Sequence, residues 1–295
     1  MAPLSPWCAP PKRRSTAPSA LPEIWSMGTE SRNPRSMKLD QMNAVEIVSL
    51  MNADEAQVLT ALTHAERLIA EAAVKVAEAF QAGGRIIYVG AGTSGRVALM
   101  DAAEMPPTFG VEPDRFIALI AGGNNAGKSA VEDAEDDDHA GIKALNELEV
   151  TPRDVVIGIA ASGSTPFVVS AVRHARQKGL WTCGIANNRG GGLLDAAELG
   201  IFLDTGPEIL TGSTRLKAGT SQKLVLNRIS TAAMVLSGKV VENLMIDVKA
   251  KNAKLKDRCA RIVMELAPVT KDEAIDLLTR YDWSIRRTLE TARRR

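Results

Sequence analysis

Cysteine and histidine are scarce in this chain of 295 residues, which has only three of each. None of Cys8, Cys183 and Cys259 forms a C-x-x-C pair, so the sequence predicts neither a zinc site nor a disulfide framework. This cysteine usage fits a reducing compartment, and we expect the protein in the cytoplasm. With so few imidazoles, a histidine-based metal site is not expected.

An excess of charge and long apolar runs are also missing. Lys and Arg number 36 and Asp and Glu number 35, so the net charge of +1 offers no electrostatic surface for nucleic acid. No run of 18 apolar residues occurs, which predicts no membrane-spanning helix. The remaining composition, 45% hydrophobic and 24% charged, is that of an ordinary globular protein of one or two domains.

The first 28 residues differ in composition from the rest. Seven of the 14 prolines fall at or before Pro34, and no acidic residue precedes Glu23. The basic residues 12–14 are not followed by an apolar segment, which argues against a secretory signal. A transit peptide is one interpretation. We favour a disordered extension over residues 1–28, with Met27 as an alternative start.

The hydrophobic pattern predicts an α/β protein. From residue 41 the period is helical, and apolar residues from Val58 to Phe80 recur every three or four positions until Gly83-Gly84. Five short apolar runs follow, most of them separated by helix-compatible stretches: residues 85–90, 115–121, 154–161, 181–187 and 199–204. Such runs are typical of parallel strands buried on both faces, so we expect a five-stranded parallel sheet in a three-layer sandwich.

This pattern divides the chain into segments. We expect an N-terminal helical segment over residues 29–75, the α/β domain over 76–240 and a C-terminal helical region over 241–295. The last region should hold about two helices, one of them beginning at a capping box formed by Thr270 and Glu273.

Two hydroxyl-rich turns follow predicted strands. The first, residues 90–95, fits G-x-G-x-x-G, but no acidic residue ends the second strand to hold a nucleotide ribose. Thr93 and Ser94 at a helix N-terminus suit a phosphate instead. The second turn contains Ser162, Ser164 and Thr165. Each turn alone could be a tight strand-to-helix turn without a ligand, with its Ser or Thr serving only as an N-cap. Two such turns at the carboxyl ends of parallel strands predict instead a phosphate site made of uncharged hydroxyl groups.

A third loop is a literal match to the Walker A pattern. Residues 122–129 read GGNNAGKS, after a strand and before a predicted helix, and Asp204 at the end of another strand could hold magnesium. A P-loop ATP-binding enzyme therefore remains an alternative at this point.

Two glutamates are candidates for acid–base chemistry. Glu104 lies near a helix end before two prolines, and Glu135 follows the second strand, whereas the aspartates 136–138 are best explained as a solvated face. Acid–base catalysis needs two carboxyl groups in different environments. Their spacing in the sequence does not establish whether Glu104 and Glu135 converge.

Together these motifs resemble the sugar isomerase (SIS) fold and, more closely, the N-acetylmuramic acid 6-phosphate etherase family. The resemblance covers about residues 29–295 and rests on these stretches, in order: TESRNP (29–34), GAGTSGR (90–96), DAAEMPPTFG (101–110), AVEDAED (130–136), GIAASGSTP (158–166), GPEILTGSTRLKAGTSQKLVLN (206–227) and GKVVENLMIDVKAKNAKL (238–255). It differs from the usual pattern at Ser164, where the family has arginine, and at Asp133, where glycine is common.

The resemblance implies a function and a site. Members cleave the ether between the sugar and D-lactate without metal or cofactor, and Glu104 and Glu135 match the catalytic glutamates. Ser213, Thr214 and Lys217 should line the same substrate pocket as the two turns. The resemblance also implies a homodimer with the site near the interface and a UBA-like C-terminal appendix. A regulator that senses sugar phosphates, like the glucokinase regulatory protein, and an aldose–ketose isomerase are the other possibilities of this fold.

Overall fold

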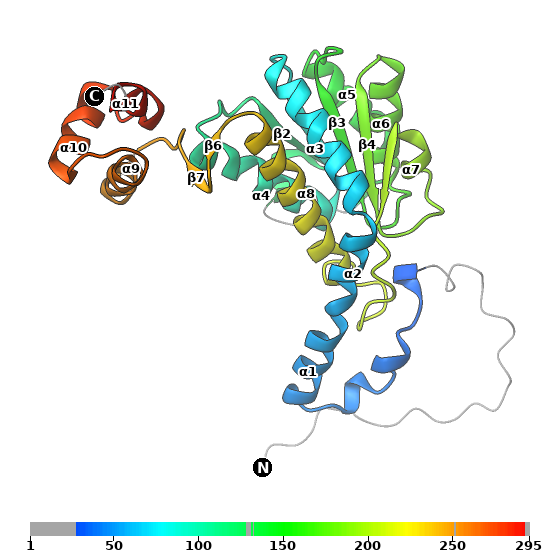
Figure 1. Cartoon of the computed structure of the whole chain (residues 1–295). Coiled ribbons are helices and arrows are strands. Elements are labelled where there is room, and N and C mark those ends of the chain that lie inside the picture. The colour runs from blue at the N-terminus through cyan, green and yellow to red at the C-terminus, as the bar shows by residue number, and fades with distance from the viewer. Residues whose placement is uncertain (1–27, 128–130, 132, 251, 293–295) are drawn as a thin grey trace, which may run out of the picture.

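A five-stranded parallel sheet forms the centre of the molecule, as predicted (Figure 1). The computed structural model describes residues 28–127, 131, 133–250 and 252–292. The strands are β1 (Ile86–Gly90), β2 (Phe116–Ile120), β3 (Val155–Ala160), β4 (Trp181–Ala186) and β5 (Leu199–Phe202), in the spatial order β2-β1-β3-β4-β5. Every neighbouring pair is parallel, so all five carboxyl ends lie at one edge of the sheet.

Helices cover both faces of the sheet and give the three predicted layers. One face packs against α3 (Glu66–Gln81), α4 (Gly92–Phe109) and α8 (Lys217–Leu236). The other packs against α5 (Asp138–Glu147), α6 (Pro166–Gln177) and α7 (Leu193–Ala196). All residues of β1 and β3 are buried, which explains why these strands are continuously apolar instead of alternating.

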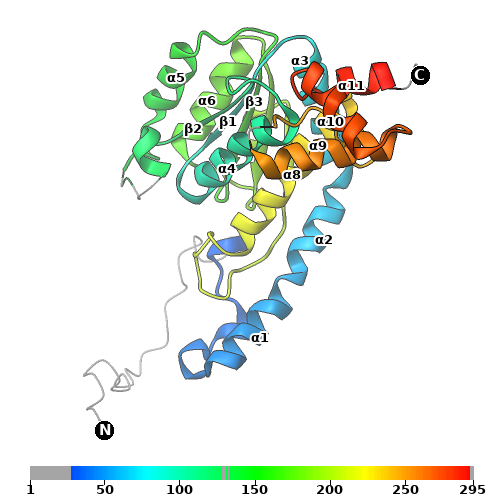
Figure 2. The ribbon, with the colours of Figure 1, turned by 90° about the vertical axis from the view of Figure 1, so that its left-hand side faces the viewer.

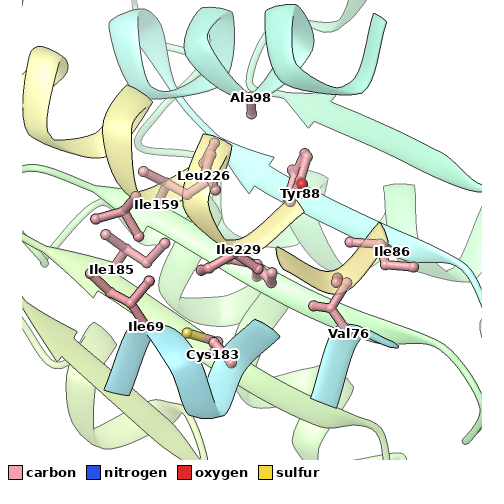
Figure 3. Close-up of a cluster of buried hydrophobic side chains, with 14 of the residues drawn as sticks. Ile69, Val76, Ile86, Tyr88, Ala98, Ile159, Cys183, Ile185, Leu226 and Ile229 are labelled. Carbon is pink, nitrogen blue, oxygen red and sulfur yellow. The ribbon is translucent and has the colours of Figure 1, made fainter. Parts of the chain in front are cut away.

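The core on the first face joins segments that lie far apart in the sequence. Figure 3 shows Ile69 and Val76 of α3 and Leu226 and Ile229 of α8 close to side chains from the strands. Cys183 on β4 lies in the same core, and burial raises the pKa of its thiol. This cysteine therefore acts as a small apolar side chain rather than as a reactive group.

The N-terminal helices form an arm. After short 3-10 turns at Gly28–Glu30, Pro34–Ser36 and Leu39–Gln41, the helices α1 (Ala44–Asp54) and α2 (Ala56–His64) lead into α3. Figures 1 and 2 both show α1 projecting away from the sheet, and Asp54 is its only buried residue. The helix α3 runs across position 75, where we expected a boundary between segments. The expected extension over residues 1–28 lies, apart from Gly28, outside the described residues.

The C-terminal region has three helices instead of the two expected. They are α9 (Ala253–Leu266), α10 (Lys271–Arg280) and α11 (Ile285–Ala292), with a separate small core, and the hairpin of β6 (Val240–Val241) and β7 (Leu244–Met245) precedes them. The capping box of Thr270 and Glu273 is confirmed. Asp282 and Trp283 have φ of +51° and +60°, and this turn divides the last stretch into two helices. No helix in the described part of the chain is long and apolar enough to cross a membrane.

Candidate active site

The first hydroxyl-rich turn joins β1 to α4, and its glycines serve close packing. A Cβ on Gly95 would lie 2.5 Å from Cγ1 of Ile120, and one on Gly90 would lie 2.7 Å from the nitrogen of Gly95. The turn can therefore bring the N-terminus of α4 against the strand ends, which explains the glycine pattern without a nucleotide. Thr93 is half-buried here, and the Ser94 side chain is buried.

Ser94 belongs to a buried chain of hydrogen bonds beneath this turn. Its hydroxyl donates to Oε1 of Gln222 on α8 at 2.8 Å, and Nε2 of Gln222 donates to Oδ1 of Asn187 at 2.9 Å. Nδ2 of Asn187, just after β4, donates to the hydroxyl of Ser221 at 2.9 Å. Three elements are thus held together at the carboxyl edge of the sheet. Neither Gln222 nor Asn187 was expected from the sequence. Gln222 lies within the stretch 206–227 that carries the family resemblance, and Asn187 is the last residue of the apolar run 181–187.

The second hydroxyl-rich turn joins β3 to α6. Ser162 and Ser164 are exposed, and the backbone nitrogen of Ser164 donates to the hydroxyl of Ser162 at 3.1 Å. Thr165 is the N-cap of α6, yet its side chain makes no capping hydrogen bond, so its hydroxyl does not serve the helix. Gly163 has φ of +72° and packs against Gly191, which ties this turn to the loop after β4.

The start of α8 adds further hydroxyl groups. A Cβ on Gly219 would lie 3.1 Å from Cγ2 of Thr93 and 3.3 Å from the carbonyl oxygen of Thr214, so these two threonines lie close together. Ser213 and Thr214 are half-buried in the turn before the helix. The buried carboxylate of Glu208 accepts hydrogen bonds from the backbone nitrogens of Lys217 and Ala218 at 3.1 and 2.9 Å and so caps α8.

Lys217 lies in a buried ion pair. Its ammonium nitrogen is 2.7 Å from Oδ2 of Asp54, the single buried residue of α1, and donates to Oε1 of Gln57 at 2.6 Å. Asn33 and Arg35 also donate to Asp54. In this arrangement the cation of Lys217 holds the N-terminal arm onto α8. Its contact with substrate stays a prediction.

The two candidate glutamates occupy different places within one chain. Glu135 is exposed in a turn before α5, and its carbonyl oxygen accepts a hydrogen bond from the nitrogen of Phe167 at 3.1 Å, which places it beside the second turn. Asp133 in the same turn has φ of +63°, a conformation that explains the usual glycine of the family. Glu104 is exposed on α4, 12 residues beyond Gly92, which corresponds to about 18 Å along the helix axis.

The Walker A pattern does not have the expected surroundings. Gly123–Gly127 forms a 3-10 helix, and α5 begins only at Asp138. Lys128 and Ser129 lie outside the described residues. Asp204 follows β5, whereas this loop follows β2, and these strands are the two opposite edges of the sheet. At about 4.8 Å per strand spacing they lie about 19 Å apart, too far for Asp204 and this loop to share a magnesium ion.

The sheet topology and the hydroxyl-rich turns are the features expected of a protein of the sugar isomerase (SIS) class. In agreement, the family model described as the glucokinase regulatory protein N-terminal SIS domain matches residues 68–176. The solved structure of a phosphoheptose isomerase from Francisella tularensis is 17% identical, with a TM-score of 0.49, covering 66% of this chain and 100% of that chain.

Sequence relatives then specify the family. An N-acetylmuramic acid 6-phosphate etherase from Geobacillus sp. (strain WCH70) is 49% identical over 90% of this chain and 88% of its own length. Another, from Halalkalibacterium halodurans, is 52% identical over 82% of this chain and 81% of its own length. The chain therefore belongs to the N-acetylmuramic acid 6-phosphate etherase family, a family of enzymes.

Proposed function

We propose that the protein releases lactate from N-acetylmuramic acid 6-phosphate, giving N-acetylglucosamine 6-phosphate and (R)-lactate in amino-sugar catabolism. The observation that supports this best is that the two hydroxyl-rich turns follow neighbouring parallel strands, β1 and β3, at the carboxyl edge of the sheet, with Glu135 beside the second turn. Open parallel sheets bind ligands at this edge.

The phosphate is bound by neutral groups. Ser162 and Thr165 provide hydroxyl donors, with Thr93 and Ser164 nearby, and the N-terminus of α4 adds backbone N–H groups and a favourable dipole. The Ser94 hydroxyl joins them by turning its proton from Gln222 to the phosphate. Ser213 and Thr214 extend the same surface, and Lys217 stays behind them in its ion pair with Asp54. Such a cradle suits a monoester phosphate without magnesium.

The two glutamates transfer protons in an elimination. With the sugar ring open, carbon 1 is an aldehyde, so the proton on carbon 2 is acidic. One carboxylate removes this proton, the bond between carbon 3 and the lactyl oxygen breaks, and the other group, as a carboxylic acid, protonates the departing oxygen. Water then adds across the double bond, with hydroxyl on carbon 3 and a proton on carbon 2. Each proton transfer contributes about 10²–10⁴-fold to the rate.

A complete site requires two copies of the chain. Five bonds of about 1.5 Å separate the phosphorus from carbon 3, so the reacting carbon lies at most about 8 Å from the phosphate. Glu104 is about 18 Å along α4 from the turn at Gly92. We therefore propose a homodimer. In each of its sites, Glu104 of one copy reaches a substrate that is held by the cradle of the other copy, beside Glu135 of that other copy. The exposed side chains of Leu99 and Met100, near Glu104, support an interface on α4.

The cytoplasm is our proposal for where this enzyme acts. It is supported by Cys183 and Cys259, which are free thiols in the described part of the chain.

The direct test is to incubate the protein with N-acetylmuramic acid 6-phosphate and EDTA and to measure lactate. We expect metal-independent lactate release, with label from heavy-oxygen water in the sugar and not in lactate, and with deuterium at carbon 2 in deuterated water. Label in lactate would refute the elimination. Saturable binding of the sugar phosphate without lactate release would support a regulator instead.

A further inference from the structure

A cavity of about 490 Å³ lies beside Glu104, away from the phosphate cradle of the same chain. It is enclosed by α4, the second half of α8 and the β6–β7 hairpin, which Figure 1 shows next to α4. Glu104 lines this cavity. If Glu104 reaches a substrate held by the second copy, the cavity therefore lies beside carbons 2 and 3 of the sugar, where the elimination takes place. The inference below therefore rests on the proposed function.

The charge of the cavity restricts which part of the substrate can enter. Its lining includes three carboxyl groups, those of Asp101, Glu104 and Glu242, and the described lining residues include no Lys, Arg or His. The phosphate and the lactyl carboxylate are both anionic, and like charges without a cation between them repel in a partly buried site. A neutral substituent is the group that this cavity accepts.

Asp101 is held in place by three donors and orients a neighbouring amide. Its Oδ2 accepts from the hydroxyl of Tyr88 at 2.8 Å, and its Oδ1 accepts from Nδ2 of Asn227 at 2.7 Å and from the hydroxyl of Ser230 at 3.1 Å. Burial raises the pKa of Asp101, and these hydrogen bonds oppose that shift. Because an acceptor faces Nδ2, the side-chain carbonyl oxygen of Asn227 is directed elsewhere and is available to a ligand N–H.

The other wall of the cavity is apolar. Met105 and Phe109 of α4 and Val240 and Met245 of the hairpin contribute to it. A group that fits therefore has both an amide N–H for Asn227 and a methyl group for this wall. Of the substituents on the substrate, only the acetamido group has both.

We propose that this cavity binds the acetamido group on carbon 2, and that Asn227 and Thr231 determine the preference for an N-acetylated sugar. The position agrees with the chemistry because the acetamido nitrogen is bonded to the carbon that loses its proton. A base or acid acting at carbon 2 or carbon 3 must therefore have the acetamido group next to it.

The test compares two substrates. One is N-acetylmuramic acid 6-phosphate, and the other is the analogue that carries a hydroxyl in place of the acetamido group, which keeps the phosphate, the lactyl ether and the neutral charge at carbon 2. We expect the wild-type protein to favour the acetylated sugar by about 10²-fold in kcat/KM. Asn227→Ala should lower kcat/KM for that sugar by about 10-fold or more and leave the analogue within about 3-fold.

A second variant keeps the network of Asp101 intact. Thr231 is exposed at the rim of the cavity, so Thr231→Phe fills it from outside without disturbing the core. This variant should also lower kcat/KM for the acetylated sugar and leave kcat/KM for the analogue nearly unchanged. Asn146→Ala, which removes an exposed amide on α5, is the matched control and should leave both substrates unchanged.

The outcomes separate the two proposals. A wild-type protein that uses both sugars equally, or variants that lose activity equally on both, would overturn the assignment of the cavity. A wild-type protein that releases no lactate from either sugar would refute the proposed function, and this inference with it.

Discussion

Mixing two inactive variants tests whether each active site draws its glutamates from two chains. Glu104→Gln and Glu135→Gln keep the size of the side chain but cannot exchange a proton. Each homodimer should therefore lose about 10²-fold or more in turnover. Substrate binding should remain, because the hydroxyl-rich turns are untouched.

The expected recovery follows from the distance along α4. If Glu104 acts about 18 Å from the cradle of its own chain, a mixed dimer has one site with both glutamines and one site with neither. Random pairing in an equal mixture makes half of the dimers mixed, and each of these has one intact site of two. Co-expressed variants should thus regain about one quarter of the wild-type lactate release.

The controls make this result decisive. Glu104→Gln mixed with the variant that carries both substitutions should recover nothing, because no pairing restores an intact site. Analytical ultracentrifugation should show a dimer in every mixture. If the mixture of single variants stays inactive while mixed dimers form, both glutamates serve the same chain, and our argument from the length of α4 is wrong.

The remaining predictions concern single positions. Lys128→Ala should leave turnover unchanged, and micromolar ATP binding lost on that substitution would revive the P-loop alternative. Gln222→Ala removes the acceptor of the Ser94 hydroxyl and should raise KM about 10-fold with a smaller change in kcat, as measured by steady-state kinetics. Burial raises the pKa of Asp154, but hydrogen bonds from Arg85 and Thr151 outweigh burial and lower this pKa below its usual value. The ionised carboxylate of Asp154 therefore stabilises the fold above about pH 3.9, and this stabilisation is lost as the pH falls through the lowered native pKa. Asp154→Asn should therefore cost about 2 kcal/mol of unfolding free energy in urea at pH 7, and the difference from wild type should shrink below pH 4.

Local sequence patterns were sufficient to predict most elements of the fold. The five apolar runs became the five strands, and β1 and β3 are continuously apolar because they are buried on both faces. The capping box at Thr270 was also predicted correctly, since its two partners are three residues apart. The third C-terminal helix was missed because the turn that precedes it contains no glycine or proline, and Trp283 is a bulky residue that rarely adopts the left-handed conformation.

The candidate site was predictable in its parts but not in its arrangement. Thr93, Ser94, Ser162 and Thr165 stood out because hydroxyl groups followed strands directly. The hydrogen bond between Ser94 and Gln222 joins residues 128 positions apart, and the ion pair of Lys217 with Asp54 joins two helices that no local pattern connects. These contacts depend on how α8 and the N-terminal arm pack.

The sequence by itself determined which segments become strands and helices, where glycine permits a tight turn, and which turns present hydroxyl groups, because each of these depends on neighbouring residues. Only the tertiary structure decided the order of the strands and the burial of Lys217 against α1. Strand order and helix packing are chosen by the burial of apolar surface across the whole domain, a property that no short stretch of the chain contains.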